Sequence, residues 1–188
     1  MAEIKTVAVI GAGNVGRGVA HVAALGGYRT ILEDILPASL RRAGSEIRGY
    51  LDQAIGLGRV SRADADAAFQ RLEYAGTVEE AARQADLVIE SVPEELESKR
   101  EIFILLDKIC RPHTILAANT QSLSVTEIAS VTYRPHEVAG MRFTHPVHAM
   151  TRLELVRGQA TDDETVAACA AVGRRLGMEV VVIREAVG

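Results

Sequence analysis

The sequence has no tryptophan, only two cysteines and few aromatic residues, which make up 4% of its 188 residues. So small an aromatic content argues against a surface on which nucleic-acid bases stack. Cys110 and Cys169 stand far apart in helical patterns, which favours two buried thiols over a disulfide or a metal-binding pair. We therefore expect no metal site, no nucleic-acid partner and a cytoplasmic location.

Long basic runs and long apolar runs are also missing. The formal net charge is −4, so a face that follows a phosphate backbone is not expected. The apolar stretch near the N-terminus is short and ends in glycines, which argues against a signal peptide, and no stretch has the length of a membrane span. Hydrophobic residues nevertheless form 48% of the chain, which predicts a globular domain with a sizeable core.

Short β-branched runs alternate with amphipathic stretches along most of the chain. This alternation predicts an α/β domain of the Rossmann type, in which helices cover a doubly wound, mostly parallel sheet. A charged stretch after Pro37 and a capping pattern at Ser61 predict a helical pair inserted after the second strand. A further capping pattern begins at Ser124. Strands are expected at residues 4–10, 28–34, 71–76, 86–92, 114–120, 137–143, 152–158 and 178–183.

The first predicted strand leads directly into the turn Gly11-Ala12-Gly13-Asn14-Val15-Gly16, which matches the pattern G-x-G-x-x-G. In a dinucleotide site Gly11 would permit the tight turn, Gly13 would let the backbone approach a pyrophosphate, and Gly16 would let the helix pack on the strand. The N-terminus of that helix would face the phosphates. Its place between a strand and a helix makes this turn a predicted dinucleotide site, in which we include Asn14 and Val15. A turn used only for packing and a flavin site are the lesser alternatives.

Glu33 and Asp34 end the second predicted strand, about 20 residues after the glycines, where dinucleotide-binding domains carry an acid. A carboxylate there accepts hydrogen bonds from the ribose hydroxyls and would repel a 2′-phosphate, so NAD is favoured over NADP. Because successive strand side chains point to opposite faces, the two acids cannot serve equally. We assign the ribose contact to Asp34, with Glu33 as the competing candidate.

Four segments are distinctive: VAVIGAGNVGRGVAHVAALGGY, ADLVIESVPEELESKREIFILLDKI, ILAANTQSLSVTEIA and GMRFTHPVHAMTRLELVRG. Together, from about Lys5 to Gly188, they resemble the NAD-binding domain of the L-3-hydroxyacyl-CoA dehydrogenases. The resemblance implies an enzyme that oxidises the 3-hydroxyl of an acyl thioester and passes the hydride to NAD. It also implies that the three glycines contact phosphate and that Asp34 contacts ribose.

The resemblance gives roles to residues at the other end of the cofactor. Glu94 and Lys99 align with an acid and a lysine near the nicotinamide, and Asn119 aligns with an asparagine beside nicotinamide and substrate. Without the resemblance, Glu94 and Lys99 would be interpreted as two solvated charges on a helix.

Two catalytic positions differ from the family pattern. The family's N-T-S-S-L becomes Asn119-Thr120-Gln121-Ser122-Leu123, so Gln121 replaces a serine that hydrogen-bonds the substrate oxygen. The family's G-x-H-F-F-N-P becomes GMRFTHP, so Arg142 stands at the catalytic histidine and His145 at the asparagine. Glu154 matches the glutamate that orients the family histidine.

Arg142 cannot be a general base, because a guanidinium stays protonated and has no acceptor. His145 offers an imidazole near the same strand end and could take the hydroxyl proton. Glu154 would then orient His145 or pair with Arg142, whereas His148 is expected to be more exposed. Alternatively, Arg142 and Gln121 suit a substrate with an anionic oxygen, or catalysis is lost while NAD binding is kept. His145 and the proline after it could also form a simple turn.

On this resemblance we expect residues 1–188 to form one NAD-binding domain. Family members add a C-terminal helical domain that closes over the substrate and usually carries the dimer interface. We expect that domain, absent from this chain, and a homodimer in the complete protein. The acyl carrier stays open at this point, as either coenzyme A or an acyl carrier protein of a polyketide pathway.

Overall fold

The structure is a computed structural model that describes residues 3–185. Residues 1–2 and 186–188, the two ends of the expected domain 1–188, lie outside the described part. The described residues form one eight-stranded sheet in the order β3-β2-β1-β4-β5-β6-β7-β8. Its strands are β1 (Thr6–Ile10), β2 (Arg29–Glu33), β3 (Leu72–Ala75), β4 (Leu87–Glu90), β5 (Ile115–Ala118), β6 (Val138–Arg142), β7 (Arg152–Arg157) and β8 (Glu179–Arg184).

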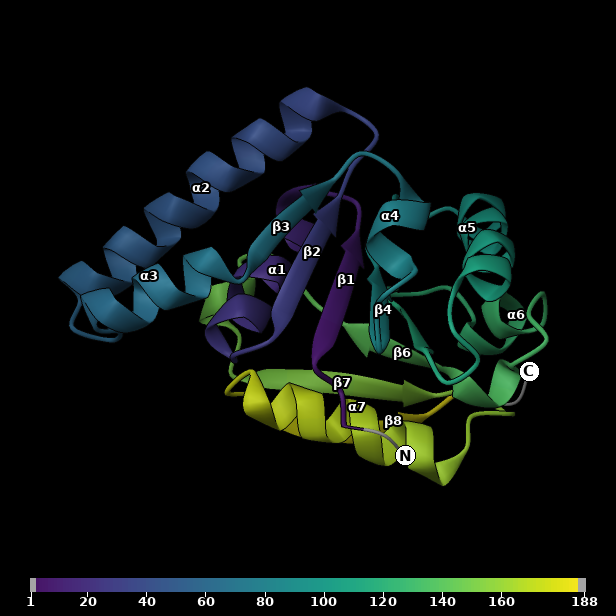
Figure 1. Cartoon of the computed structure of the whole chain (residues 1–188). Helices are drawn as coiled ribbons and strands as arrows, with labels where there is room; N and C mark the ends of the chain where they lie inside the picture. Colours follow the sequence, from purple (N-terminus) through teal and green to yellow (C-terminus); the bar gives the residue numbers. More distant parts are fainter. Residues whose placement is uncertain (1–2, 186–188) are drawn as a thin grey trace.

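Neighbouring strands of this sheet run parallel except β6 and β7, which pair antiparallel. The prediction of a doubly wound, mostly parallel Rossmann-type sheet is therefore confirmed. Seven of the eight strands are shorter than the sequence predicted by one to three residues, and β8 has the predicted length but is shifted by one residue. The sheet twists strongly, so β7 and β8 run across the direction of β1–β3 (Figure 1).

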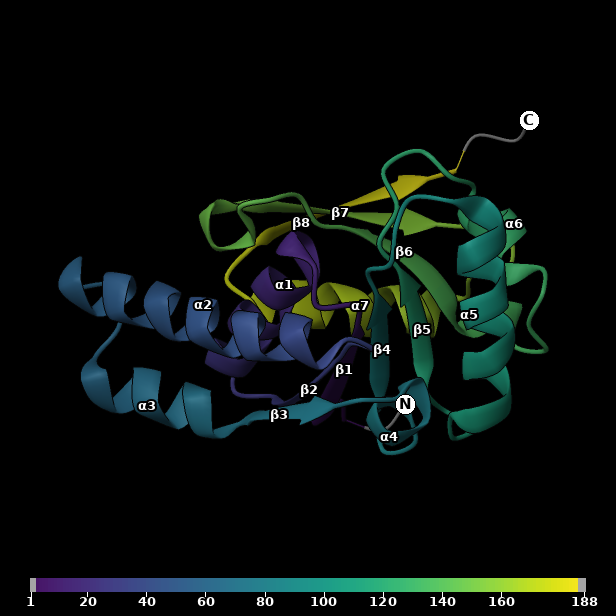
Figure 2. The same cartoon turned by 90° about the horizontal axis from the view of Figure 1, so that it is seen from above.

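Seven α-helices and two short 3-10 helices connect these strands within the described part of the chain. The predicted helical pair after β2 is confirmed as α2 and α3, which project away from the sheet (Figures 1 and 2). The five-residue helix α4 was not among the predicted elements, although Thr77 and Glu80 have the spacing of a capping box. The Thr77 hydroxyl accepts the N–H of Glu80 at the start of this helix. The helices are α1 (Asn14–Leu25), α2 (Pro37–Gly56), α3 (Arg62–Gln70), α4 (Val78–Ala82), α5 (Leu96–Ile109), α6 (Val125–Ala129) and α7 (Asp163–Arg175), with η1 (Pro135–Glu137) and η2 (Val147–Ala149).

Both predicted helix caps are present. The hydroxyl of Ser61 accepts the N–H of Asp64 at the start of α3, and that of Ser124 accepts the N–H of Glu127 at the start of α6. Each bond satisfies one of the backbone donors that a helix N-terminus leaves unpaired. The polar residues between the apolar runs therefore fix where these helices begin.

Each face of the sheet carries its own apolar core. One core lies under α1 and α7 and includes Val9, Val19 and Cys169. The other lies under α4, α5 and α6 and includes Ala8 and Phe103. Ala8 and Val9 are neighbours in β1, so the strand buries both of its faces, as a central parallel strand must.

Both cysteines are buried and unpaired, as the sequence predicted. Burial raises the pKa of Cys110 to about 11 and that of Cys169 to about 12, so both thiols stay protonated. Across the described residues, no helix is both long enough and apolar enough to cross a bilayer.

Candidate functional site

A cleft of about 880 Å³ opens at the carboxyl edge of the sheet. Its walls come from the glycine turn after β1, the end of β2, the loop after β4, and the turns after β5 and β6. Ligands of open parallel sheets bind at this edge, where the connections on either side of the sheet diverge. Its volume is within the range of small-molecule and cofactor sites.

The glycine turn has the geometry that a dinucleotide requires. Gly11 has φ of +99°, and a Cβ there would lie 2.8 Å from the carbonyl oxygen of Ser91. A Cβ on Gly16 would lie 1.8 Å from the carbonyl oxygen of Gly11, so only glycine lets α1 pack this closely. A Cβ on Gly13 would meet nothing within 4 Å. It would instead occupy the space beside the turn where a pyrophosphate has to approach, so the turn fits the group predicted for it.

The acid chosen for the ribose lies at the mouth of the cleft. Oδ2 of Asp34 accepts the N–H of Ala12 at 3.0 Å, and Oδ1 accepts the N–H of Leu36 at 2.9 Å. These bonds hold the carboxylate beside the glycine turn while leaving lone pairs for hydroxyl donors. Asp34 therefore lines the cleft beside the glycine turn, and its ribose contact stays a prediction.

The competing acid, Glu33, also lines the cleft but is only 6% exposed. Burial above all, and the neighbouring carboxylate of Asp34, raise the pKa of Glu33 to about 7. The sequence argument that the two adjacent acids would differ in environment is consistent with this difference in burial.

At the other end of the cleft lies a buried ion pair, formed by Lys99 and Glu90. Lys99 and Glu90 are both fully buried, and Nζ of Lys99 lies 2.8 and 3.0 Å from the two carboxylate oxygens. The same Nζ donates to the carbonyl oxygens of Asn119 at 2.9 Å and Val92 at 3.3 Å. Burial raises the pKa of Glu90 although Lys99 opposes that shift.

This geometry corrects the assignment of Lys99 as a cofactor-binding residue. Its side chain lies beneath the wall of the cleft and is enclosed by four acceptors, so it supports β4, β5 and α5 rather than contacting a ligand. The alternative of a solvated helix charge is wrong for the same reason, since the side chain has no exposed surface.

Glu94 holds the turn after β5 in place. Its Oε1 accepts the hydroxyl of Thr120 at 2.6 Å and the N–H groups of Gln121 and Ser122 at 2.8 and 3.0 Å. Burial would raise the pKa of Glu94, but these hydrogen bonds outweigh it and lower the pKa. Glu94 precedes α5 instead of lying on it, and it lines the cleft as a charged group.

Asn119 and Gln121 both line the cleft and are both tied to the segment after β6. Oδ1 of Asn119 accepts the N–H of Phe143 at 2.9 Å, and its Nδ2 points to the Ser91 hydroxyl at 3.4 Å. Nε2 of Gln121 donates to the carbonyl oxygen of Phe143 at 3.0 Å. Oε1 of Gln121 has no hydrogen-bond partner among residues 3–185 and can accept from a substrate hydroxyl.

Three of the predicted catalytic residues do not lie together: His145 lies in the cleft, whereas Arg142 and Glu154 pair with each other outside it. His145 is exposed and lines the cleft beside Thr144, where it can reach a bound ligand. Arg142 and Glu154 face each other in the antiparallel pairing of β6 with β7, with 3.1 Å between Nη1 and Oε2. Nε of Arg142 also donates to the carbonyl oxygen of Thr120 at 3.2 Å.

Glu154 therefore takes the second of its two predicted roles and pairs with Arg142 rather than orienting His145. Neither member of this pair is among the cleft-lining residues of the described chain. This corrects their assignment to the catalytic centre, because the guanidinium is already engaged by a carboxylate and a carbonyl oxygen.

His148 is exposed, as expected, and lies away from the cleft. Its ring centroid is 5.0 Å from that of Tyr50 and 6.2 Å from that of His21. The three rings border a separate hollow beside α1 and α2. His148 is thus a neighbour of His145 in sequence but not in the cleft.

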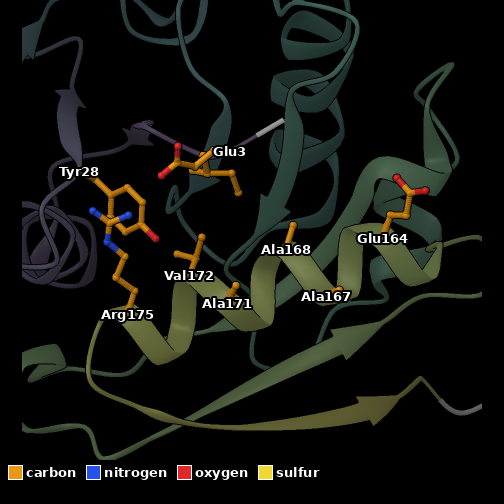
Figure 3. Close-up of a pocket in the computed structure, with 9 residues that line it drawn as sticks. Glu3, Tyr28, Glu164, Ala167, Ala168, Ala171, Val172 and Arg175 are labelled. Carbon is orange, nitrogen blue, oxygen red and sulfur yellow. The ribbon is translucent and has the colours of Figure 1, made fainter. Parts of the chain in front are cut away.

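A further hollow, shown in Figure 3, lies beside α7 and the residues preceding β1 and β2. Its floor is formed largely by alanines of α7, and the guanidinium of Arg175 lies 4.4 Å from the ring centroid of Tyr28. None of the predicted site residues borders it. It opens near the amino ends of the strands, the opposite edge from the cleft.

Two supporting residues escaped the sequence reasoning. Glu90 ends β4 and pairs with Lys99 nine residues later, a separation with no regular period, so only its place at a strand end could have suggested it. Arg17 follows the glycine turn and is buried, although an arginine at that position suggests a solvated helix charge.

Comparison with known proteins supports the family resemblance found in the sequence. Residues 6–186 match the family model described as 3-hydroxyacyl-CoA dehydrogenase, NAD binding domain. A probable 3-hydroxybutyryl-CoA dehydrogenase of Bacillus subtilis is 38% identical over 97% of this chain and 63% of its own length. A 3-hydroxyadipyl-CoA dehydrogenase of Escherichia coli is 39% identical over 88% of this chain and 35% of its own length.

The solved structures agree with these sequence relatives. The crystal structure of (S)-3-hydroxybutyryl-CoA dehydrogenase from Ralstonia eutropha superimposes with a TM-score of 0.94 at 32% identity. That alignment covers 98% of this chain and 65% of the other. The chain thus spans less than two thirds of the length of these relatives.

Proposed function

The chain belongs to the 3-hydroxyacyl-CoA dehydrogenase NAD-binding domain family, and from this premise we propose that it supplies the cofactor half of an NAD-dependent 3-hydroxyacyl-thioester dehydrogenase. The observation that carries the proposal is the single cleft that the glycine turn, Asp34 and Asn119 all line. Bound NAD would accept the hydride, and the residues of the cleft would position it. Asp34 would accept from the ribose hydroxyls and would repel a 2′-phosphate, so the cofactor is NAD rather than NADP.

We propose His145 as the group that takes the substrate hydroxyl proton. Histidine is the side chain best suited to proton transfer near neutral pH, and His145 lines the same cleft as Gln121. Gln121 would orient the substrate oxygen through its unengaged Oε1. Asn119, fixed by Phe143, would position the reacting end of the cofactor.

A catalytically altered NAD-binding protein is the second candidate, and one observation favours it. The side chain at the position of the family histidine is Arg142, which is engaged with Glu154 and cannot accept a proton. An anionic substrate is the third interpretation of Arg142. It has less support from the geometry, because Glu154 already neutralises the guanidinium.

The remaining parts of the proposal concern the complete protein. We propose a helical domain beyond this chain that closes the cleft and carries a homodimer interface. The exposed side chains of β8, among them Val182 at 47% exposure, would suit its packing. The substrate carrier is coenzyme A, as in the names of the relatives, with an acyl carrier protein as the alternative. The two unpaired thiols fit a cytoplasmic location.

The test is turnover by the full-length protein. NADH formation would be followed with 3-hydroxybutyryl-CoA, 3-hydroxyadipyl-CoA and a carrier-protein-linked 3-hydroxyacyl thioester. The proposal expects NAD-dependent turnover of at least one thioester. NAD binding without turnover of any of them would favour the altered protein instead.

A further inference from the structure

Arg17 is a buried arginine in the first turn of α1, and its guanidinium joins the glycine turn to the inserted helix α2. The residue is 7% exposed. Its Nη2 donates to Oδ1 of Asn14 at 2.5 Å, and its Nε lies 2.6 Å from Oε2 of Glu46. Asn14 is the first residue of α1 and lines the cofactor cleft, whereas Glu46 lies on α2.

The chemistry of arginine fixes which way the Asn14 amide points. A guanidinium has five N–H donors and no acceptor, so it can bond only to the oxygen of the amide. The amide nitrogen, Nδ2, is therefore turned away from Arg17, and it has no hydrogen-bond partner among residues 3–185. A donor is thus left available at the edge of the turn, next to Gly13, on the wall of the cleft.

Building on the proposed function, we infer that Nδ2 of Asn14 donates a hydrogen bond to the pyrophosphate of the dinucleotide, and that Arg17 is a positioning residue that holds this amide through its oxygen. Glu46 in turn holds Arg17, so the inserted helix α2 contributes to cofactor binding without contacting the cofactor. An anionic pyrophosphate oxygen is the acceptor that this donor fits.

A second arginine that pairs with Glu46 allows the positioning role of Arg17 to be separated from the effect of its positive charge. Arg42 also pairs with Glu46, with 2.8 Å between Nε and Oε1, but its side chain is 71% exposed and does not contact Asn14. Arg42 above all, and Arg17, lower the pKa of Glu46, so the acid stays ionised between them. The two arginines share one carboxylate, and only Arg17 reaches the amide, which makes Arg42 a matched control.

The experiment measures NAD and adenosine binding by calorimetry on the full-length protein and its variants. Asn14→Ala should weaken NAD binding about 10-fold to 100-fold, the effect of a hydrogen bond to a charged group. Adenosine, which lacks the pyrophosphate, should bind wild type and variant equally. Asn14→Asp should lose more NAD affinity than Asn14→Ala, because it places a carboxylate where the inferred donor stands.

The positioning role is tested by combining variants. Arg17→Met should weaken NAD binding about 3-fold to 10-fold, the cost of ordering a side chain that is no longer held. That loss should disappear in the Asn14→Ala background, and Arg42→Met should change nothing. A loss that persists in the Asn14→Ala background would mean that Arg17 acts by its charge or by a structural effect, and would overturn the positioning role.

Unchanged NAD affinity in both Asn14→Ala and Asn14→Asp would overturn the inferred hydrogen bond itself. If Arg17→Met fails to fold, which loss of adenosine binding would reveal, the two Asn14 variants still decide this point. Failure of the wild-type protein to bind NAD would instead refute the proposed function, so the two failures are distinguishable.

Discussion

Replacing Lys99 by methionine would remove one partner of a fully buried ion pair while keeping much of the side-chain volume. In the native structure Nζ of Lys99 bonds both carboxylate oxygens of Glu90 and two backbone carbonyl oxygens. The variant would leave the Glu90 carboxylate buried and without its cation. Removing one partner of such a pair typically costs about 3–5 kcal/mol.

A loss of that size would be a large share of the whole stability, since domains are commonly stable by about 5–15 kcal/mol. The assay is urea unfolding of the 188-residue chain followed by circular dichroism, with the free energy of unfolding extrapolated to water. The matched control is the double variant Glu90→Gln with Lys99→Met. It removes the uncompensated charge and keeps an acceptor for the N–H of Val92, so most of the stability should return.

A loss below about 1 kcal/mol in Lys99→Met would refute the reasoning, because that is the effect of a solvated surface pair. The double variant also tests the correction made to the role of Lys99. As a supporting residue, its replacement should leave NAD affinity close to that of the wild type once stability is restored. A stable double variant that no longer bound NAD would support the original assignment of Lys99 as a cofactor-binding residue.

Three further predictions follow from the cleft. Gly13→Val should weaken NAD and NADP binding alike, because its side chain would fill the space beside the turn; a calorimetric titration with unchanged affinity would contradict this. His145→Ala should lower kcat of the complete enzyme by about 10²–10⁴-fold with NAD affinity retained, whereas His148→Ala should have little effect; full activity of His145→Ala would exclude it as the base. The pKa of Glu33 is raised to about 7 in the folded chain, above its value in the unfolded chain. The folded state therefore binds more protons than the unfolded state between these values. The free energy of unfolding should fall as pH rises from about 4.5 to 7. Glu33→Gln should therefore gain stability over wild type at pH 8 but not at pH 4, and a stability difference independent of pH would count against this.

The sequence predicted the elements whose signals are local. The run from β1 through Gly11, Gly13 and Gly16 predicted both the fold class and the cleft. Gly11 and Gly16 stand where the backbone packs too closely for a Cβ, and Gly13 leaves the space beside the turn open. Ser61 and Ser124 marked their helix starts because a cap bonds the backbone within three residues. The alternation of apolar runs predicted a mostly parallel sheet, which the structure confirms.

The sequence could not predict features that depend on distant partners. Lys99 has the sequence surroundings of a helix-surface charge, and only the fold brings it under β4 to meet Glu90. The same holds for Arg17, whose partner Glu46 lies on the inserted helix. Glu154 was expected either to orient His145 or to pair with Arg142, and the register of β6 with β7 places it opposite Arg142.

The central claim, an NAD site built on the glycine turn and Asp34, is tested most directly by calorimetric titration of the protein with NAD and with NADP. The account predicts tighter binding of NAD, because the carboxylate of Asp34 stands beside the turn where a 2′-phosphate would have to lie. Asp34→Ala should narrow that preference. Equal affinity for the two cofactors, or tighter binding of NADP by the wild-type protein, would contradict the account.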